Sequence, residues 1–185
     1  MPAFLAELRQ REGMAARCLE FVILTACRSG EARGATWSEI DLGAKQWTIP
    51  AERMKAERPH RVPLSDAAVA LLEAQPRFAG SDLVFWAPRG GTLSDMALTA
   101  VTRRMGVDAV PHGMRSTFRD WCSERTAYPR DAADMALAHT IGDKVEAAYR
   151  RGELLEKRRR MMADWAAFIS TPKPPAEVVD LASIR

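Results

Sequence analysis

Apolar positions recur at helical spacing in the first part of the chain. One such stretch covers residues 3–9, and a longer one covers residues 14–26. This spacing predicts two helices whose apolar sides pack in a common core. Ser29 and Gly30 then interrupt the pattern, and a short helical turn is expected over residues 31–37.

The next part of the chain carries short runs that favour strands. Residues 47–50 and 61–64 are rich in β-branched or aromatic side chains, and a polar stretch containing Lys55 separates them. These two runs predict a small antiparallel sheet. Residues 83–86 are expected to form another short strand, followed by a turn over residues 88–91.

Helical patterns dominate the rest of the chain. Ser65 is placed to cap a helix that ends before Pro76, and Ser94 is placed to cap a helix that runs to about residue 105. Four further helices are expected, over residues 112–126, 130–137, 144–150 and 152–169. The predicted fold class is therefore α+β, mainly α, with the small sheet near the N-terminal third.

Composition indicates one soluble globular domain. The 185 residues are 47% hydrophobic and 28% charged, enough for a single core, which we assign to residues 1–170 with a tail over 171–185. The longest apolar run, residues 21–27, is too short to span a membrane, and no signal sequence opens the chain, so a cytoplasmic protein is expected. Cys18, Cys27 and Cys122 form no Cys-x-x-Cys pair, and buried thiols are expected.

Positive charge is concentrated late in the chain. The net charge is only +3, but residues 144–160 hold seven Lys or Arg against three Glu. This stretch either faces the phosphates of a nucleic acid or forms a solvated helix face. The charge pattern alone does not choose between the two.

Several polar residues stand where they can act chemically. Arg28 follows an apolar helix, with Glu31 three residues later to orient its guanidinium. His112 and Arg115 project from one face at the start of a helix, and an anion between them would relieve their mutual repulsion. Each pair, taken alone, is equally typical of an ordinary surface.

The full set forms a recognisable series. Arg28, Lys55, His112-x-x-Arg115, His139 and Tyr149 stand in the order and at the intervals of the six-residue active site of the tyrosine recombinase (phage integrase) family, which this chain resembles. The flanking segments 25–31, 47–55 and 137–139 resemble the boxes around those residues, and the likeness is closest to satellite-phage-type prophage integrases. Ala138 stands where the family often has glycine. The arm-binding and core-binding domains that usually precede the catalytic domain are not part of this sequence.

The resemblance implies a role for each residue. Arg28 and Arg115 would clamp the scissile phosphate, Tyr149 would attack it, and His112 would accept the tyrosine proton. Lys55 would protonate the departing 5′ oxygen, His139 would hydrogen-bond the phosphate, and Glu31 would support Arg28. No metal, ATP or other cofactor is expected, because the phosphotyrosine link conserves the energy of the phosphodiester.

The resemblance also implies the partners. Double-stranded DNA at attachment sites is the expected substrate, bound by a homotetramer that exchanges its C-terminal tails, with no membrane and no small-molecule substrate. The candidate DNA-contacting residues are Arg103, Arg104, Arg119, Lys144, Arg150 and Arg151.

Two other functions stay open at this stage. A type IB topoisomerase shares the tyrosine chemistry, although such enzymes carry lysine where this chain has His112. A truncated prophage remnant would bind DNA without cutting it; the missing front domains favour that reading, and the complete active-site set opposes it.

Overall fold

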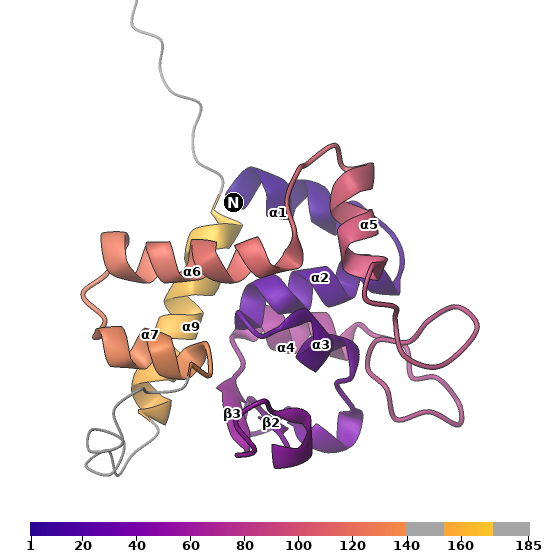
Figure 1. The fold of residues 1–185 in the computed structure, drawn as a ribbon, viewed down its shortest axis with the longest axis horizontal. Coiled ribbons are helices and arrows are strands. Elements are labelled where there is room, and N and C mark those ends of the chain that lie inside the picture. The colour runs from indigo at the N-terminus through magenta and orange to yellow at the C-terminus, as the bar shows by residue number, and fades with distance from the viewer. Residues whose placement is uncertain (140–153, 172–185) are drawn as a thin grey trace, which may run out of the picture.

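The computed structural model describes residues 1–139 and 154–171. Helices surround a central helix, and a small sheet lies at one side of the molecule (Figure 1). The mainly helical α+β prediction is thereby confirmed. No helix within the described ranges is long and apolar enough to cross a membrane.

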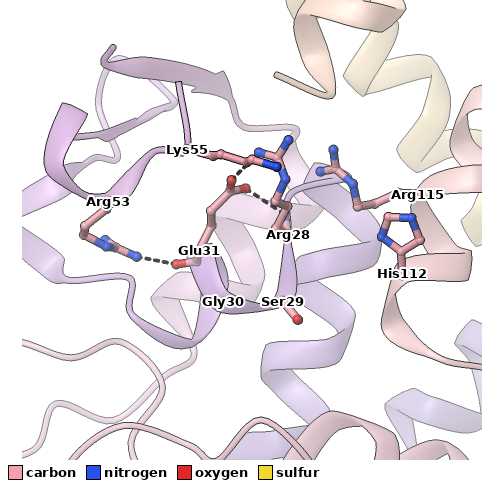
Figure 2. A pocket seen from close by; sticks show the side chains of 8 residues that line it. All are labelled: Arg28, Ser29, Gly30, Glu31, Arg53, Lys55, His112 and Arg115. Carbon is pink, nitrogen blue, oxygen red and sulfur yellow. Dashed lines mark hydrogen bonds and ion pairs between the residues drawn. The ribbon is translucent and has the colours of Figure 1, made fainter. Parts of the chain in front are cut away.

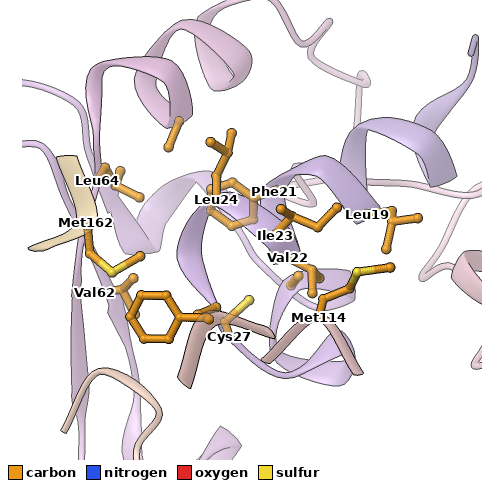
Figure 3. Close-up of a cluster of buried hydrophobic side chains, with 14 of the residues drawn as sticks. Leu19, Phe21, Val22, Ile23, Leu24, Cys27, Val62, Leu64, Met114 and Met162 are labelled. Atoms are coloured by element: carbon orange, nitrogen blue, oxygen red, sulfur yellow. The ribbon is translucent and has the colours of Figure 1, made fainter. Parts of the chain in front are cut away.

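The central helix is α2 (Met14–Thr25). It contacts α1 (Pro2–Arg9) and most of the other helices, and every residue from Cys18 to Thr25 is buried. A helix that is buried on all sides belongs to the interior of the fold. Figure 3 shows its side chains packed among residues from distant parts of the chain, including Val62, Met114 and Met162.

A left-handed residue ends α2 and turns the chain into the next helix. Ala26 has φ +53°, and after it the short helix α3 (Ser29–Arg33) begins with Arg28 as its N-cap residue. The predicted turn over residues 31–37 was wrong in position. Glu31 accepts a hydrogen bond from the main-chain N–H of Arg28 at 2.7 Å, which starts the helix earlier, and the 3-10 turn η1 (Trp37–Glu39) follows separately.

The sheet contains three antiparallel strands in the order β1 (Ile40–Asp41), β2 (Gln46–Ile49) and β3 (His60–Pro63). Trp47 of β2 lies opposite Val62 of β3, and the sheet packs on α2 where the Trp47 ring approaches Phe21, with ring centroids 5.2 Å apart. The two predicted strands are confirmed, each displaced by one residue. The 3-10 turn η2 (Ala51–Arg53) follows β2.

The segment between the sheet and the second helical half corrects two predictions. Ser65 does cap α4 (Asp66–Glu73), since its hydroxyl accepts from the Ala68 N–H at 3.3 Å. The predicted strand over residues 83–86 makes only isolated bridges, because its two ends pair with different segments, Leu83 with Thr36 and Trp86 with Thr92. Ser94 caps nothing: residues 94–96 form a turn, and α5 (Ala97–Arg104) begins three residues later.

Of the last three helices, two pack against α2 and the one between them in sequence packs on those two. The helix α6 (Pro111–Arg125) crosses the molecule, α7 (Arg130–Ala136) returns beside it, and α9 (Leu155–Ser170) runs behind both (Figure 1). All three agree with prediction to within a residue or two where they are described. The predicted helix over residues 144–150 and the tail lie outside the described residues.

The three cysteines are buried free thiols, as predicted. Burial raises the pKa of Cys27 and of Cys122 to about 12, and it raises that of Cys18 well above the ordinary value. A thiol with such a pKa stays neutral near pH 7 and is a poor nucleophile.

Candidate active site

Four of the predicted catalytic residues line one pocket. Its volume is about 390 Å³, and its walls come from the start of α3, the turn between β2 and β3, and the start of α6 (Figure 2). The lining residues are Arg28, Ser29, Gly30, Glu31, Arg53, Lys55, His112 and Arg115. The pocket therefore gathers four cationic side chains and an exposed imidazole around one acidic group.

The acidic group is Glu31, which holds Arg28. Its Oε1 accepts from Arg28 Nη1 at 2.7 Å while its Oε2 accepts from the Arg28 main-chain N–H. The Glu31 side chain is 6% exposed and that of Arg28 is 35% exposed. One carboxylate thus fixes both ends of the arginine, and part of the guanidinium still faces the pocket.

Arg115 is held by main-chain carbonyls. It is 4% exposed, and its two terminal nitrogens donate to the carbonyl oxygens of Ala26 and Leu137, each at 2.6 Å. Burial lowers the pKa of Arg115, and the nearby charge of Arg28 lowers it further. Two guanidinium groups in such proximity form a site for an anion.

The segment after α7 contacts Arg28 through Ala138, and His139, the next residue, does not line the pocket. Ala138 has φ +47°, and its carbonyl accepts from Arg28 Nη2 at 3.3 Å. His139 Nδ1 lies 3.4 Å from Asp134 Oδ1. Partial burial lowers the pKa of His139; Asp134 acts in the opposite direction, and Arg115 reinforces the lowering.

Lys55 lies on the turn between η2 and β3, and its side chain extends into the pocket beside Arg28 (Figure 2). Arg53, two residues earlier, lines the same pocket and donates to the Glu31 carbonyl. Sequence reasoning missed Arg53, Ser29 and Gly30. The spacing of Arg53 from Lys55 is a weak sequence signal that it lies near the site. Ser29 and Gly30 line the pocket because they form the first turn of α3.

The remaining predicted residues fall into two groups, those outside the described residues and those that line other surfaces. Tyr149, Lys144, Arg150 and Arg151 are outside the described residues. Arg103 and Arg104 stand at the end of α5, and Arg104 lines a different pocket, between α5 and the start of α2. Arg119 is exposed on α6 and lines a third pocket, together with Tyr128.

The described part of the chain contains no group of three or more His, Cys, Asp or Glu placed to hold a metal ion. In the pocket itself, one carboxylate is already engaged by Arg28 and the remaining side chains are mostly cationic. Such a lining favours a negatively charged ligand over a metal cation.

Comparisons with known proteins identify relatives of this chain. The chain is 39% identical over 162 residues to the prophage integrase IntA of Escherichia coli K12, and the match covers 84% of this chain and 39% of IntA. It is 33% identical over 190 residues to the integrase of Enterobacteria phage P4, covering 91% of this chain and 43% of that protein. The chain thus spans about two fifths of the length of these relatives.

The fold has solved counterparts as well. The integrase of mycobacterium phage Brujita superposes with a TM-score of 0.71 at 16% identity, over 93% of this chain and 59% of that one. The model of the phage integrase family matches residues 2–153, which include every predicted catalytic position. This chain belongs to the phage integrase family.

Proposed function

We propose that this chain is the catalytic domain of a site-specific recombinase that cuts and rejoins double-stranded DNA at attachment sites through a 3′-phosphotyrosine. The observation that carries the proposal is the single pocket in which Arg28, Lys55, His112 and Arg115 meet. These four residues come from three separate parts of the sequence, and the fold gathers them around a space suited to one phosphate.

The two arginines suit a phosphodiester in its transition state. Charge on the non-bridging oxygens grows as the nucleophile attacks, and donors that are already fixed stabilise it without reorganising. Arg115 donates one N–H of each terminal nitrogen to a carbonyl, and no residue in the described ranges accepts from the other N–H of either nitrogen, so both can donate to a phosphate oxygen. Arg28, fixed by Glu31, supplies the second clamp.

Tyr149 is the proposed nucleophile, and the other tyrosine is poorly suited to that role. Tyr128 donates to Asp164 Oδ2 at 2.5 Å, and burial together with this carboxylate raises its pKa to about 12. It also lines a different pocket. Tyr149 follows His139 by ten residues, and an extended chain of that length reaches about 35 Å, ample for reaching the phosphate.

The proposed chemistry divides the remaining work between three side chains. His112 accepts the proton of Tyr149 as its oxygen attacks phosphorus, and Lys55 gives a proton to the 5′ oxygen as the bond to phosphorus breaks. His139 donates a hydrogen bond to the phosphate. Because the phosphotyrosine retains the phosphodiester energy, we expect rejoining to need neither ATP nor a metal.

The partner is proposed to be DNA, bound by a homotetramer. Support comes from the cationic pocket and from the relatives, which are named as integrases of prophages and phages. The predicted backbone contacts are those of Arg103, Arg104, Arg119, Lys144, Arg150 and Arg151, and the tail over residues 171–185 is proposed to be exchanged between subunits.

The test is capture of the covalent intermediate. Wild type and Tyr149→Phe are each incubated, with a chelator, on nicked DNA carrying the candidate attachment region, so that the short 5′-hydroxyl strand leaves and the complex accumulates. We expect an SDS-resistant band with wild type alone. No band despite retained binding would refute strand cleavage and favour a DNA-binding remnant, and relaxation of plasmid lacking the site would indicate a topoisomerase.

A further inference from the structure

Arg53 joins the turn that carries Lys55 to helix α3. Its Nη2 donates to the main-chain carbonyl of Glu31, and its Nη1 donates to both carboxylate oxygens of Glu39 (Figure 2 shows the first of these bonds). The Arg53 side chain is 25% exposed and that of Glu39 is 11% exposed. Because Nη1 is held by the Glu39 carboxylate and Nη2 by the Glu31 carbonyl, the largely buried guanidinium is fixed in one orientation.

Glu39 is itself fixed from the opposite side. Its Oε2 accepts from the indole N–H of Trp47 at 2.9 Å and from the main-chain N–H of Thr36 at 3.3 Å. Trp47 is completely buried in β2. The carboxylate therefore connects the guanidinium of Arg53 to the rigid centre of the sheet.

Gly34 provides the space for this arrangement. A Cβ added there would lie 2.9 Å from Arg53 Nη2, inside van der Waals contact. The backbone of Gly34 has φ −98°, which alanine also adopts. The requirement at this position is therefore room for the guanidinium, and not an unusual backbone conformation.

We infer that Arg53 and Glu39 are positioning residues that hold the Lys55 turn against α3, and so keep the Lys55 ammonium beside the scissile phosphate. This inference rests on the proposed recombinase function. Lys55 follows Arg53 by two residues on an otherwise exposed turn, with only Met54 buried between them. Three hydrogen bonds from its terminal nitrogens go to Glu31 and Glu39, so we assign Arg53 to holding the turn and not to the phosphate.

The step that depends on this link is protonation of the leaving group. The Tyr149 oxygen forms a bond to phosphorus, the bond from phosphorus to the 5′ oxygen breaks, and that oxygen takes a proton from the Lys55 ammonium. Lys55 is left as a neutral amine, and the tyrosine proton stays on His112. A displacement of Lys55 by about 1 Å is enough to slow such a step on the order of 100-fold.

A sulfur substitution in the DNA isolates that step. When sulfur replaces the bridging 5′ oxygen, the leaving group is a thiolate whose pKa, about 8.5, lies far below that of an alcohol, so it departs without a proton. Arg53→Lys is expected to slow covalent-complex formation by roughly 10- to 100-fold on the oxygen substrate and by less than about 3-fold on the sulfur substrate. Lys55→Ala provides the reference pattern.

Two further variants make the comparison specific. Gly34→Ala keeps the arginine at position 53 but displaces its guanidinium. It should slow covalent-complex formation on the oxygen substrate and not on the sulfur substrate. Arg33→Lys is the matched control. Arg33 also donates to a carbonyl and a carboxylate, those of Leu93 and Asp95, but these bonds lead away from the Lys55 turn. In Arg33→Lys, the rate of covalent-complex formation should therefore change by the same factor on the oxygen and the sulfur substrate.

Amide hydrogen exchange tests, independently of catalysis, whether Arg53 holds the Lys55 turn. The amides of Met54 and Glu57 are hydrogen-bonded within the turn, at 3.0 Å each, and both should exchange faster in Arg53→Lys than in wild type. Equal loss on the two substrates, or unchanged exchange, would overturn the inference. A wild type that forms no Tyr149-dependent complex on either substrate would instead refute the proposed function, and the catalytic role of the link with it.

Discussion

Replacing Arg115 by alanine should lower the free energy of unfolding by about 2–4 kcal/mol. The side chain is 4% exposed, and its bonds to Ala26 and Leu137 connect the end of α2 to the end of α7 through α6. Alanine would leave both carbonyls without this donor in a largely buried place. The residue proposed to bind phosphate is thus also a structural cross-link.

The magnitude follows from two opposing effects. A hydrogen bond from a charged donor contributes about 1.5–3 kcal/mol, so the two bonds of Arg115 together stabilise the fold by roughly twice that amount. Burial and the charge of Arg28 both lower the pKa of Arg115, which means that the folded protein holds this cation at some cost. Removing the cation recovers part of the loss, and the net value falls to about 2–4 kcal/mol.

The assay is urea unfolding followed by far-ultraviolet circular dichroism, with wild type, Arg115→Ala and Arg119→Ala compared at one pH. Arg119 lies one turn later on α6 and is exposed, so its loss should change stability by no more than about 0.5 kcal/mol. If the two variants unfold at the same urea concentration with equal slopes, Arg115 does not connect the helices as described.

Two other predictions concern the segment after α7. Ala138→Gly should leave the free energy of unfolding unchanged or raise it by up to about 1 kcal/mol, because glycine adopts φ +47° without strain. The control Ala133→Gly, inside α7, should lower the free energy of unfolding by about 1 kcal/mol. Equal losses in both variants, measured by urea unfolding, would contradict the strain argument. The pKa of His139 is lowered in the folded protein, so the unfolded chain binds more protons and stability should rise with pH up to about 6.5. His139→Gln should remove that part of the slope in urea midpoints measured across this range, and an unchanged slope would assign it to other groups.

The helices were predictable because their signals are local. The apolar spacing of α2 and α6 and the Ser65 cap are all properties of neighbouring residues, and each placed its element to within two residues. The failures depended on contacts between distant segments. Residues 83–86 have strand-like composition but form only isolated bridges to two separate segments. The helix α3 begins early because the Glu31 carboxylate accepts from the main-chain N–H of Arg28.

The candidate site divides in the same way. The resemblance to the tyrosine recombinase active site identified Arg28, Lys55, His112 and Arg115, and the fold gathers them in one pocket. Arg53 went unnoticed because its partners, a carbonyl in α3 and a carboxylate beyond it, are far away in the sequence. The placement of Tyr149 stays a prediction.

The site's two arginines show why such geometry escapes sequence reasoning. Both donate to main-chain carbonyls at or beside the left-handed alanines Ala26 and Ala138. A sequence motif contains the donors, because these are arginine side chains. It does not contain the acceptors, because a main-chain carbonyl is present in every residue. We therefore expect substitutions at Ala26 and Ala138 to act through backbone conformation: residues that tolerate positive φ should keep the arginines in place, and β-branched residues should displace them while every motif residue remains intact.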